Sequence, residues 1–311
     1  MKTPELSPME FAAEKARSDR KIWANKGWNI EYTIDFTSPS GRPAPLDSQS
    51  KKKVRTVYAL HGFARPLEDF ASFTQAWPER CAFISVHLPH HGTSGPDLGT
   101  RPLDDAIEPK DLLLLLNEIA LHEGVSTSKP DLIGYSIGGR IALSLIAIDP
   151  KKWNRVLLLA PDGLKQSPFY GLTVHTQLGK ALWFAIDTHS QAVLLWSNRF
   201  LNWKLLSPHM HAFIAFHLSS HSMRMAVWNG WRAHRKCWPS HHSLATAFSQ
   251  TEGSIDLFFG IHDRIIPLKN GNRLRQKTNS MPHVNFHSIP SGHGMLREDV
   301  LKIIIQRTFK T

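Results

Sequence analysis

Short apolar runs alternate with longer stretches of helical periodicity along most of this chain. Runs of four to nine mostly apolar or β-branched residues predict strands, at 28–36, 54–60, 81–88, 130–135, 155–160, 254–260 and 284–290. Apolar positions at helical spacing predict helices at 67–77, 108–124, 137–150, 268–276 and 296–308. Near-continuous apolar strands that alternate with helices are typical of a parallel sheet buried on both faces. We therefore expect an α/β fold, a mostly parallel twisted sheet with helices on both faces.

The rhythm changes between residues 163 and 250. This stretch contains no convincing strand, but it holds six of the ten tryptophans and half of the 18 histidines. We interpret it as an inserted helical cap. The predicted domains are thus an N-terminal helix, edge strand and loop over 1–53, an α/β core over 54–162 and 251–311, and the cap over 163–250.

Charge and cysteine usage narrow the expected partners. The formal net charge is +11, but apart from the three lysines at 51–53 the basic residues are scattered, so we do not expect nucleic-acid binding. An anionic small-molecule substrate fits the charge better, and peripheral membrane contact is an alternative that we do not expect. The N-terminus lacks the apolar stretch of a secretory signal, and the two cysteines form neither a metal knuckle nor a redox pair. A cytoplasmic location is the expectation.

One motif departs from good packing chemistry. The segment Gly134-Tyr135-Ser136-Ile137-Gly138 places a serine between two glycines where a predicted strand runs directly into a predicted helix. Such a sharp bend requires small neighbours, lifts the serine hydroxyl clear of the sheet and places it at the positive end of the helix. The motif predicts a nucleophilic serine.

A serine hydroxyl needs a base and an acid to become nucleophilic. His293 follows the last predicted strand, and Asp263 follows the strand before it. Asp162, after the strand at 155–160, is an alternative acid. The order Ser136, Asp263, His293 resembles that of the α/β-hydrolase superfamily, in which a cap is inserted after the sixth strand. The resemblance covers residues 54–305, and because "GIHDRIIP" resembles the family's acid loop it favours Asp263 over Asp162.

The resemblance also implies an oxyanion hole and no cofactor. "LHGF" resembles the family's His-Gly loop, so the backbone N–H groups of Phe63 and Ile137 are expected to bind the oxyanion, with His61 bracing the loop. "HLPHHGTSG" resembles another family turn but carries His87 and His90 in place of an aspartate and a glycine. No metal is expected, although several cap histidines are close in sequence, at 209, 211, 217, 221, 241 and 242.

These features predict a serine hydrolase that cleaves a carboxylic ester or thioester through an acyl-enzyme. The expected substrate is small to medium in size and largely apolar, with or without an anionic head group. Two alternatives stay open. The same triad serves C–C bond hydrolases and lyases in families of this kind, and some members bind ligands without catalysis.

Overall fold

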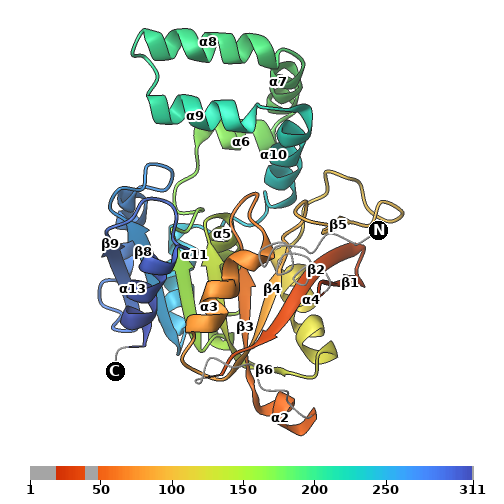
Figure 1. The fold of residues 1–311 in the computed structure, drawn as a ribbon, viewed down its shortest axis with the longest axis vertical. Helices are drawn as coiled ribbons and strands as arrows, with labels where there is room; N and C mark the ends of the chain where they lie inside the picture. Colours follow the sequence, from red (N-terminus) through yellow and green to blue (C-terminus); the bar gives the residue numbers. More distant parts are fainter. Residues whose placement is uncertain (1–18, 39–47, 310–311) are drawn as a thin grey trace, which may run out of the picture.

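A nine-stranded sheet forms the centre of the molecule, for which a computed structural model describes residues 19–38 and 48–309 (Figure 1). The strands are β1 (Lys21–Asn25), β2 (Trp28–Phe36), β3 (Arg55–Leu60), β4 (Cys81–Val86), β5 (Gly95–Pro96), β6 (Ser126–Tyr135), β7 (Arg155–Leu159), β8 (Ser254–Gly260) and β9 (Val284–Ile289). Their order is β1-β2-β4-β3-β6-β7-β8-β9, and β5 pairs with β2. All pairs from β4 to β9 are parallel, whereas β2 is antiparallel to its neighbours. The predicted mostly parallel sheet is confirmed.

Helices cover both faces of the sheet. Successive side chains of a strand point to opposite faces, and here both faces are apolar and are buried by helices. In β3, Tyr58 and Leu60 join the larger apolar core, while Val57 and Ala59 join the smaller one. The larger core is covered by α4 (Pro109–His122), α5 (Ile137–Ile148), α11 (His241–Gln250) and α12 (Asn272–Thr278). The smaller core is covered by α3 (Ala71–Ala76) and α13 (Glu298–Thr308). The 3-10 turns η1 (Leu67–Phe70), η2 (Pro150–Lys152) and η3 (Leu268–Gly271) precede α3, follow α5 and precede α12.

The N-terminal region differs from its prediction. The predicted N-terminal helix falls largely on residues 1–18, which lie outside the described residues, but Lys21–Asn25 forms β1 and makes β1 the edge strand. The two-residue turn Lys26–Gly27 has φ angles of 51° and 74°, the geometry of a tight hairpin turn. Within the predicted loop, Ser48–Lys53 forms the short helix α2, whose three lysines occupy the favourable C-terminal turn.

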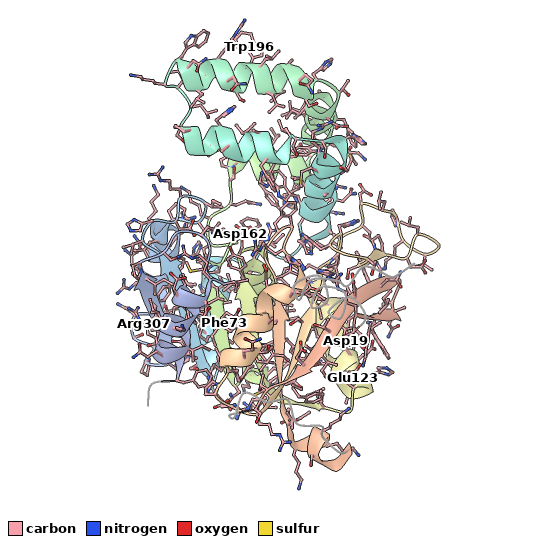
Figure 2. All side chains as sticks on the ribbon, in the orientation of Figure 1. Asp19, Phe73, Glu123, Asp162, Trp196 and Arg307 are labelled. Carbon is pink, nitrogen blue, oxygen red and sulfur yellow. The ribbon has the colours of Figure 1, made fainter. Side chains whose placement is uncertain are left out.

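The insertion between β7 and β8 forms a helical cap above the carboxyl edge of the sheet (Figures 1 and 2). Its helices are α6 (Pro168–His175), α7 (Gln177–Thr188), α8 (Ser190–Asn202), α9 (Pro208–His217) and α10 (His221–Ala233). Helix α11 packs instead on α5 and α12 in the core, so the predicted cap boundary at 250 lies too far along the chain. Helical periodicity identifies the buried face of a helix but not the layer that covers it. No described helix combines the length and apolar character needed to cross a bilayer.

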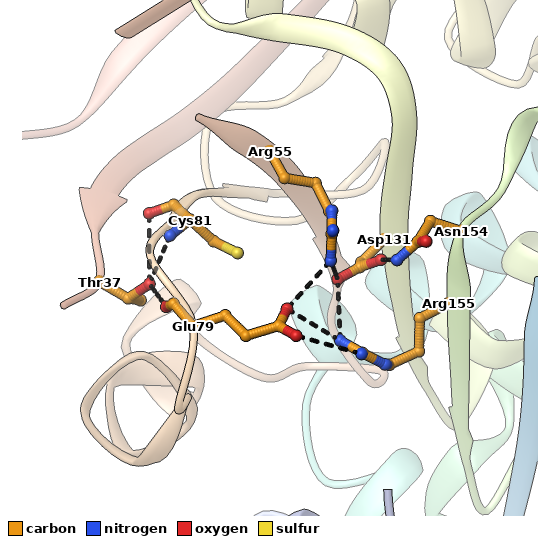
Figure 3. Close-up of polar contacts among 7 residues, drawn as sticks. All are labelled: Thr37, Arg55, Glu79, Cys81, Asp131, Asn154 and Arg155. Carbon is orange, nitrogen blue, oxygen red and sulfur yellow. Dashed lines mark hydrogen bonds and ion pairs between the residues drawn. The ribbon is translucent and has the colours of Figure 1, made fainter. Parts of the chain in front are cut away.

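An ion-pair network around one buried aspartate links the amino ends of the strands, opposite the cap (Figure 3). The Asp131 carboxylate is buried between Arg155, at 3.3 Å, and Arg55, at 3.7 Å. Both arginines also contact Glu79. Glu79, Asp131 and nearby Cys81 form the one group of three metal-ligand types within the described ranges, but the arginines already neutralise its carboxylates. We interpret the network as structural.

Candidate active site

Ser136 occupies the bend between β6 and α5. Its φ of 54° lies in the left-handed region, which is unfavourable for a residue with a side chain, so the surrounding contacts must hold it there. The Ser136 N–H donates to the carbonyl of Leu159 at 2.9 Å, and its own carbonyl accepts from Asp162 N–H at 2.9 Å. A strained backbone at the start of a helix fits the nucleophile elbow that the sequence predicts.

The elbow glycines are required by close approach of the backbone. A Cβ on Gly134 would lie 2.6 Å from the carbonyl oxygen of Gly138, and one on Gly138 would lie 2.1 Å from that of Leu60. Real Cβ atoms do not approach so closely, and backbone atoms cannot easily move away. The two glycines therefore let α5 start directly against β3.

Three side chains from separate loops form a hydrogen-bonded relay. His293 Nε2 lies 3.1 Å from Ser136 Oγ, and His293 Nδ1 lies 2.8 Å from Asp263 Oδ2. The other oxygen, Asp263 Oδ1, accepts from the N–H groups of Ile265 and Ile266 at 2.8 and 2.9 Å. The Asp263 carboxylate is fully buried, so these bonds fix its orientation and that of the imidazole. The order and spacing match a serine–histidine–acid triad.

The alternative acid lies in a different environment. Asp162 Oδ1 accepts from Gly163 N–H at 2.7 Å, and Asp162 Oδ2 lies 3.6 Å from an Arg140 guanidinium nitrogen. Figure 2 places Asp162 at the boundary between core and cap. Asp263, by contrast, bonds directly to His293. The geometry thus favours Asp263 as the orienting acid.

Tyr135 contributes a contact that sequence reasoning missed. Its hydroxyl donates to the carbonyl of His293 at 2.9 Å, and the two rings lie 5.4 Å apart. A Cβ on Gly62 would lie 2.9 Å from the Tyr135 ring, so Gly62 is also needed at this position. Tyr135 thereby ties the histidine loop to the elbow. Its place inside the Gly-Tyr-Ser motif was the available signal.

The two expected oxyanion donors come from segments that are bonded to each other. The carbonyl of His61 accepts from Gly138 N–H at 3.1 Å, which holds the loop carrying Phe63 against the first turn of α5, where Ile137 begins the helix. N–H groups in a first helical turn lack partners within the helix. This arrangement is compatible with the predicted donation by Phe63 and Ile137.

His61 is a neutral bracing residue in this geometry. Its Nδ1 donates to the Gly62 carbonyl at 2.6 Å, and its Nε2 accepts from Leu88 N–H at 3.0 Å. Complete burial holds the pKa of His61 well below its usual range, which keeps the accepting nitrogen unprotonated. The bond to Leu88 joins the oxyanion loop to the 87–95 turn.

Glu31 replaces the acid that the 87–95 turn lacks. His87 Nδ1 lies 2.9 Å from Glu31 Oε2, which also accepts from the N–H and hydroxyl of Thr93 at 2.7 and 3.0 Å. Burial opposes ionisation of Glu31, but the bonds from Thr93 and His87 outweigh it and lower the Glu31 pKa to about 2. The family-like turn with His87 is therefore braced from β2.

Arg140 is a second residue that the sequence analysis missed. It lies one helical turn after Ser136, is only 1% exposed, and stacks on the rings of Trp238 at 4.7 Å and Tyr170 at 5.1 Å. A buried arginine in an otherwise apolar helix was the sequence signal. Arg140 connects the elbow helix to the segments where the chain enters and leaves the cap.

A groove of about 590 Å³ lies beside this arginine. Trp238 and Gly163 line it, and its polar wall carries Lys165, His241, His242, Lys269, Arg273 and Lys277. No lining residue in the described part of the chain is acidic. The groove is therefore suited to an anionic group.

The cap histidines make other contacts. His211 Nδ1 lies 3.0 Å from Ser197 Oγ, and His221 Nδ1 lies 3.0 Å from Asp187 Oδ1. Among the described residues, none of the cap histidines belongs to a group of three ligand types close enough to share a metal ion.

Two curated proteins share part of the sequence. One, from Bacillus subtilis (strain 168), is provisionally named 2-succinyl-6-hydroxy-2,4-cyclohexadiene-1-carboxylate synthase; it is 24% identical over 126 residues, 40% of this chain and 43% of that protein. The other, from Pseudomonas putida, is the dihydrolipoyllysine-residue acetyltransferase component of an acetoin cleaving system. It is 23% identical over 158 residues, 51% of this chain and 37% of that protein. The matches thus span less than half of either relative.

Solved structures share the fold. The α/β hydrolase MGS-M2, from a Medee basin deep-sea metagenome library, superposes with a TM-score of 0.62 at 14% identity, over 94% of this chain and 98% of that one. A carboxylesterase structure from the thaumarchaeon Nitrososphaera gargenis gives 0.56 at 13% identity, over 92% and 97%. A family model described as "Alpha/beta hydrolase family" matches residues 57–301. The parallel sheet and the elbow agree with this match, and the chain belongs to the alpha/beta hydrolase family.

Proposed function

We propose that the protein is a serine hydrolase that cleaves a carboxylic ester or thioester through an acyl-enzyme. The observation that carries the proposal is the relay from Ser136 through His293 to Asp263, with contacts of 3.1 and 2.8 Å. A serine so placed has both a base for its proton and an acid to orient that base.

The chemistry follows from the positions of these groups. His293 Nε2 takes the Ser136 proton as Oγ forms a bond to the substrate carbonyl carbon, and the N–H groups of Phe63 and Ile137 stabilise the oxyanion. The imidazolium then gives its proton to the leaving alcohol or thiol as the C–O or C–S bond breaks. A water, deprotonated by His293, hydrolyses the acyl-enzyme and regenerates Ser136. Asp263 holds the imidazole in the tautomer that accepts at Nε2.

Aromatic residues of the cap support an apolar acyl group. Trp183 and Trp228 form a buried cluster against which Phe63, from the expected oxyanion loop, packs. Their rings stack at 6.1 Å. The cap thus presents mainly apolar surface to the expected oxyanion loop, which favours apolar acyl groups over charged ones.

The basic groove supports a negative charge on a part of the substrate distant from the reacting carbonyl, since no triad residue lines the groove. Its Lys269, Arg273 and Lys277 repeat at helical spacing and so lie along one side of η3 and α12. Within the described ranges, none of the three forms an ion pair. A carboxylate or phosphate on the leaving group would find unpaired cations there.

Covalent labelling tests the hydrolase proposal directly. A fluorophosphonate probe should label the wild-type protein at one serine and leave Ser136→Ala unlabelled, and p-nitrophenyl esters of graded chain length should be hydrolysed by the wild type alone. A folded wild type that neither labels nor hydrolyses any ester would favour a non-catalytic ligand-binding role.

A pair of arginines on one helix tests the anionic end. Arg273 lines the groove, whereas Arg275, also exposed on α12, does not. We expect Arg273→Ala to raise KM for an acyl-coenzyme A about tenfold, with little change for a neutral p-nitrophenyl ester of the same acyl group. Arg275→Ala should change neither. Equal effects of the two variants would refute a specific role for the groove.

The groove also favours one alternative reaction, C–C bond cleavage or elimination on a carboxylate-bearing substrate with the same triad. The two reactions differ in their first product. Ester hydrolysis should release a stoichiometric burst of alcohol or thiol as the acyl-enzyme accumulates. Turnover of a carboxylate substrate with no acylated Ser136 would favour the alternative.

A further inference from the structure

The outermost helix of the cap exposes aromatic side chains to solvent. Trp196, Phe200 and Trp203 are 49%, 40% and 59% exposed, and Leu195 beside them is 65% exposed. We call these four residues the α8 outer face. Figure 2 shows Trp196 on the helix farthest from the sheet. Soluble proteins rarely leave a contiguous apolar patch of this kind without a partner.

Helical geometry directs these side chains away from the rest of the cap. Residues 196, 200 and 203 are spaced i, i+4 and i+7, so they form one stripe, and their rings lie 5.9 and 6.0 Å apart. Ser197, which is buried, points the other way, toward His211 of α9. The α8 outer face is thus not the packing surface between α8 and α9.

The charge around this face has one sign. Residues 163–240 contain eight lysines and arginines and one acid, Asp187. Four of these cations, on α7, on α10 and after α10, are paired with Asp104, Glu108 or Asp187 and do not count toward this face. Asp187 is already engaged by Arg224 at 2.6 Å and by His221. Arg199 lies on the stripe itself, 5.1 Å from the Trp196 ring, and Lys204 directly follows Trp203, the C-cap of α8. A second copy of the chain would bring like charges together, whereas an anionic surface complements them.

This composition is typical of an interfacial helix, which lies on a membrane without spanning it. Such helices expose tryptophan and leucine next to lysine and arginine. Tryptophan prefers the region between lipid headgroups and acyl chains, and each basic residue adds attraction to anionic lipid. We propose that the α8 outer face docks on the surface of an anionic lipid bilayer. This inference does not depend on the proposed reaction.

Vesicle binding tests it with a matched pair of leucines. Leu195 on α8 and Leu121 on the core helix α4 are both helical and both 65% exposed. Co-sedimentation of the full chain should be at least about tenfold stronger with equimolar phosphatidylcholine and phosphatidylglycerol than with phosphatidylcholine alone. It should fall when salt rises from about 50 mM to about 500 mM. Leu195→Ser should weaken binding about tenfold, and Trp196→Ser with Trp203→Ser more, whereas Leu121→Ser should have no effect.

Every other outcome overturns the proposal. Absence of vesicle binding, equal binding to neutral vesicles, or equal losses in the two leucine variants would each refute it. A dimer that light scattering detects in the wild type and that Leu195→Ser dissociates would instead assign the face to a second copy. Hydrolysis of a water-soluble ester without vesicles should be unchanged in all these variants. The membrane proposal can therefore fail while the hydrolase proposal holds, and the reverse. Circular dichroism and melting temperature check that the exposed substitutions leave the fold intact.

Discussion

Replacing Asp263 with asparagine should remove most of the activity of the Ser136–His293–Asp263 triad while the protein still folds. The carboxylate has two distinct tasks in the structure. Oδ1 accepts from the N–H groups of Ile265 and Ile266, and Oδ2 accepts from His293 Nδ1. An amide can perform only one of these tasks, because one of its two atoms is a donor.

The hydrogen bonds lost in each case show which of its two orientations the new side-chain amide should adopt. With the amide nitrogen toward Ile265 and Ile266, two buried N–H donors would lose their acceptor at a cost of about 1–3 kcal/mol each. With the nitrogen toward His293, only one bond must rearrange, and the imidazole adopts the tautomer with its proton on Nε2. That tautomer cannot accept the Ser136 proton. We therefore expect Asp263→Asn to fold and to lose about 10³–10⁴-fold in kcat, or about 4–5 kcal/mol.

The assay is steady-state hydrolysis of a p-nitrophenyl ester, with thermal unfolding measured in parallel. Asp162→Asn is the matched control. That carboxylate accepts a hydrogen bond from Gly163 N–H and forms an ion pair with Arg140, and its replacement should cost less than about tenfold in activity. If Asp263→Asn keeps more than about a tenth of wild-type kcat, or if Asp162→Asn shows the larger loss, the assignment of Asp263 is wrong.

Three further predictions concern stability. Gly138→Ala should prevent folding or destabilise the protein by at least about 2–3 kcal/mol in urea unfolding, because its Cβ would lie 2.1 Å from a backbone oxygen, whereas Gly171→Ala, with nothing nearer than 3.7 Å, should be neutral or stabilising. Arg155→Met should cost about 3–5 kcal/mol because it leaves the buried Asp131 short of a counter-charge; a loss below about 1 kcal/mol would contradict that view of the network. The depressed pKa of Glu31, about 2 against an ordinary 4.5, stabilises the fold above pH 4.5, and this contribution is lost as pH falls toward 2. Glu31→Gln should therefore be less stable at pH 7 by roughly 2 kcal/mol after allowance for solvent screening, and the difference should shrink by pH 3; a constant difference would refute the linkage.

Buried strands were the easiest elements to predict. The strands Trp28–Phe36 and Ser254–Gly260 have the predicted bounds, because unbroken apolar or alternating runs leave little choice of period. The Lys26–Gly27 hairpin was missed because its lysine has a positive φ, which its residue type does not signal. The layer to which α11 belongs depends on long-range packing with α5 and α12, which periodicity does not encode.

The site was predictable where its residues carry a local motif. Ser136, Asp263 and His293 each follow a strand at the carboxyl edge of a parallel sheet, so their meeting follows from topology. Tyr135 and Arg140 were not predicted, because their roles arise from contacts with a distant carbonyl and with cap rings. Glu31 reaches the turn at His87 from a strand 56 residues away in sequence.

The places where the chain enters and leaves the cap lie together. Gly163 on the way in and Trp238 and Ser240 on the way out line the same groove, and Arg140 contacts both sides. An insertion whose two ends meet can lengthen, shorten or be exchanged without shifting the register of β7 and β8. The cap, and with it substrate preference, can therefore change in evolution while the catalytic residues of the core stay the same. Transplanting the cap of a relative would be a practical route to new substrates.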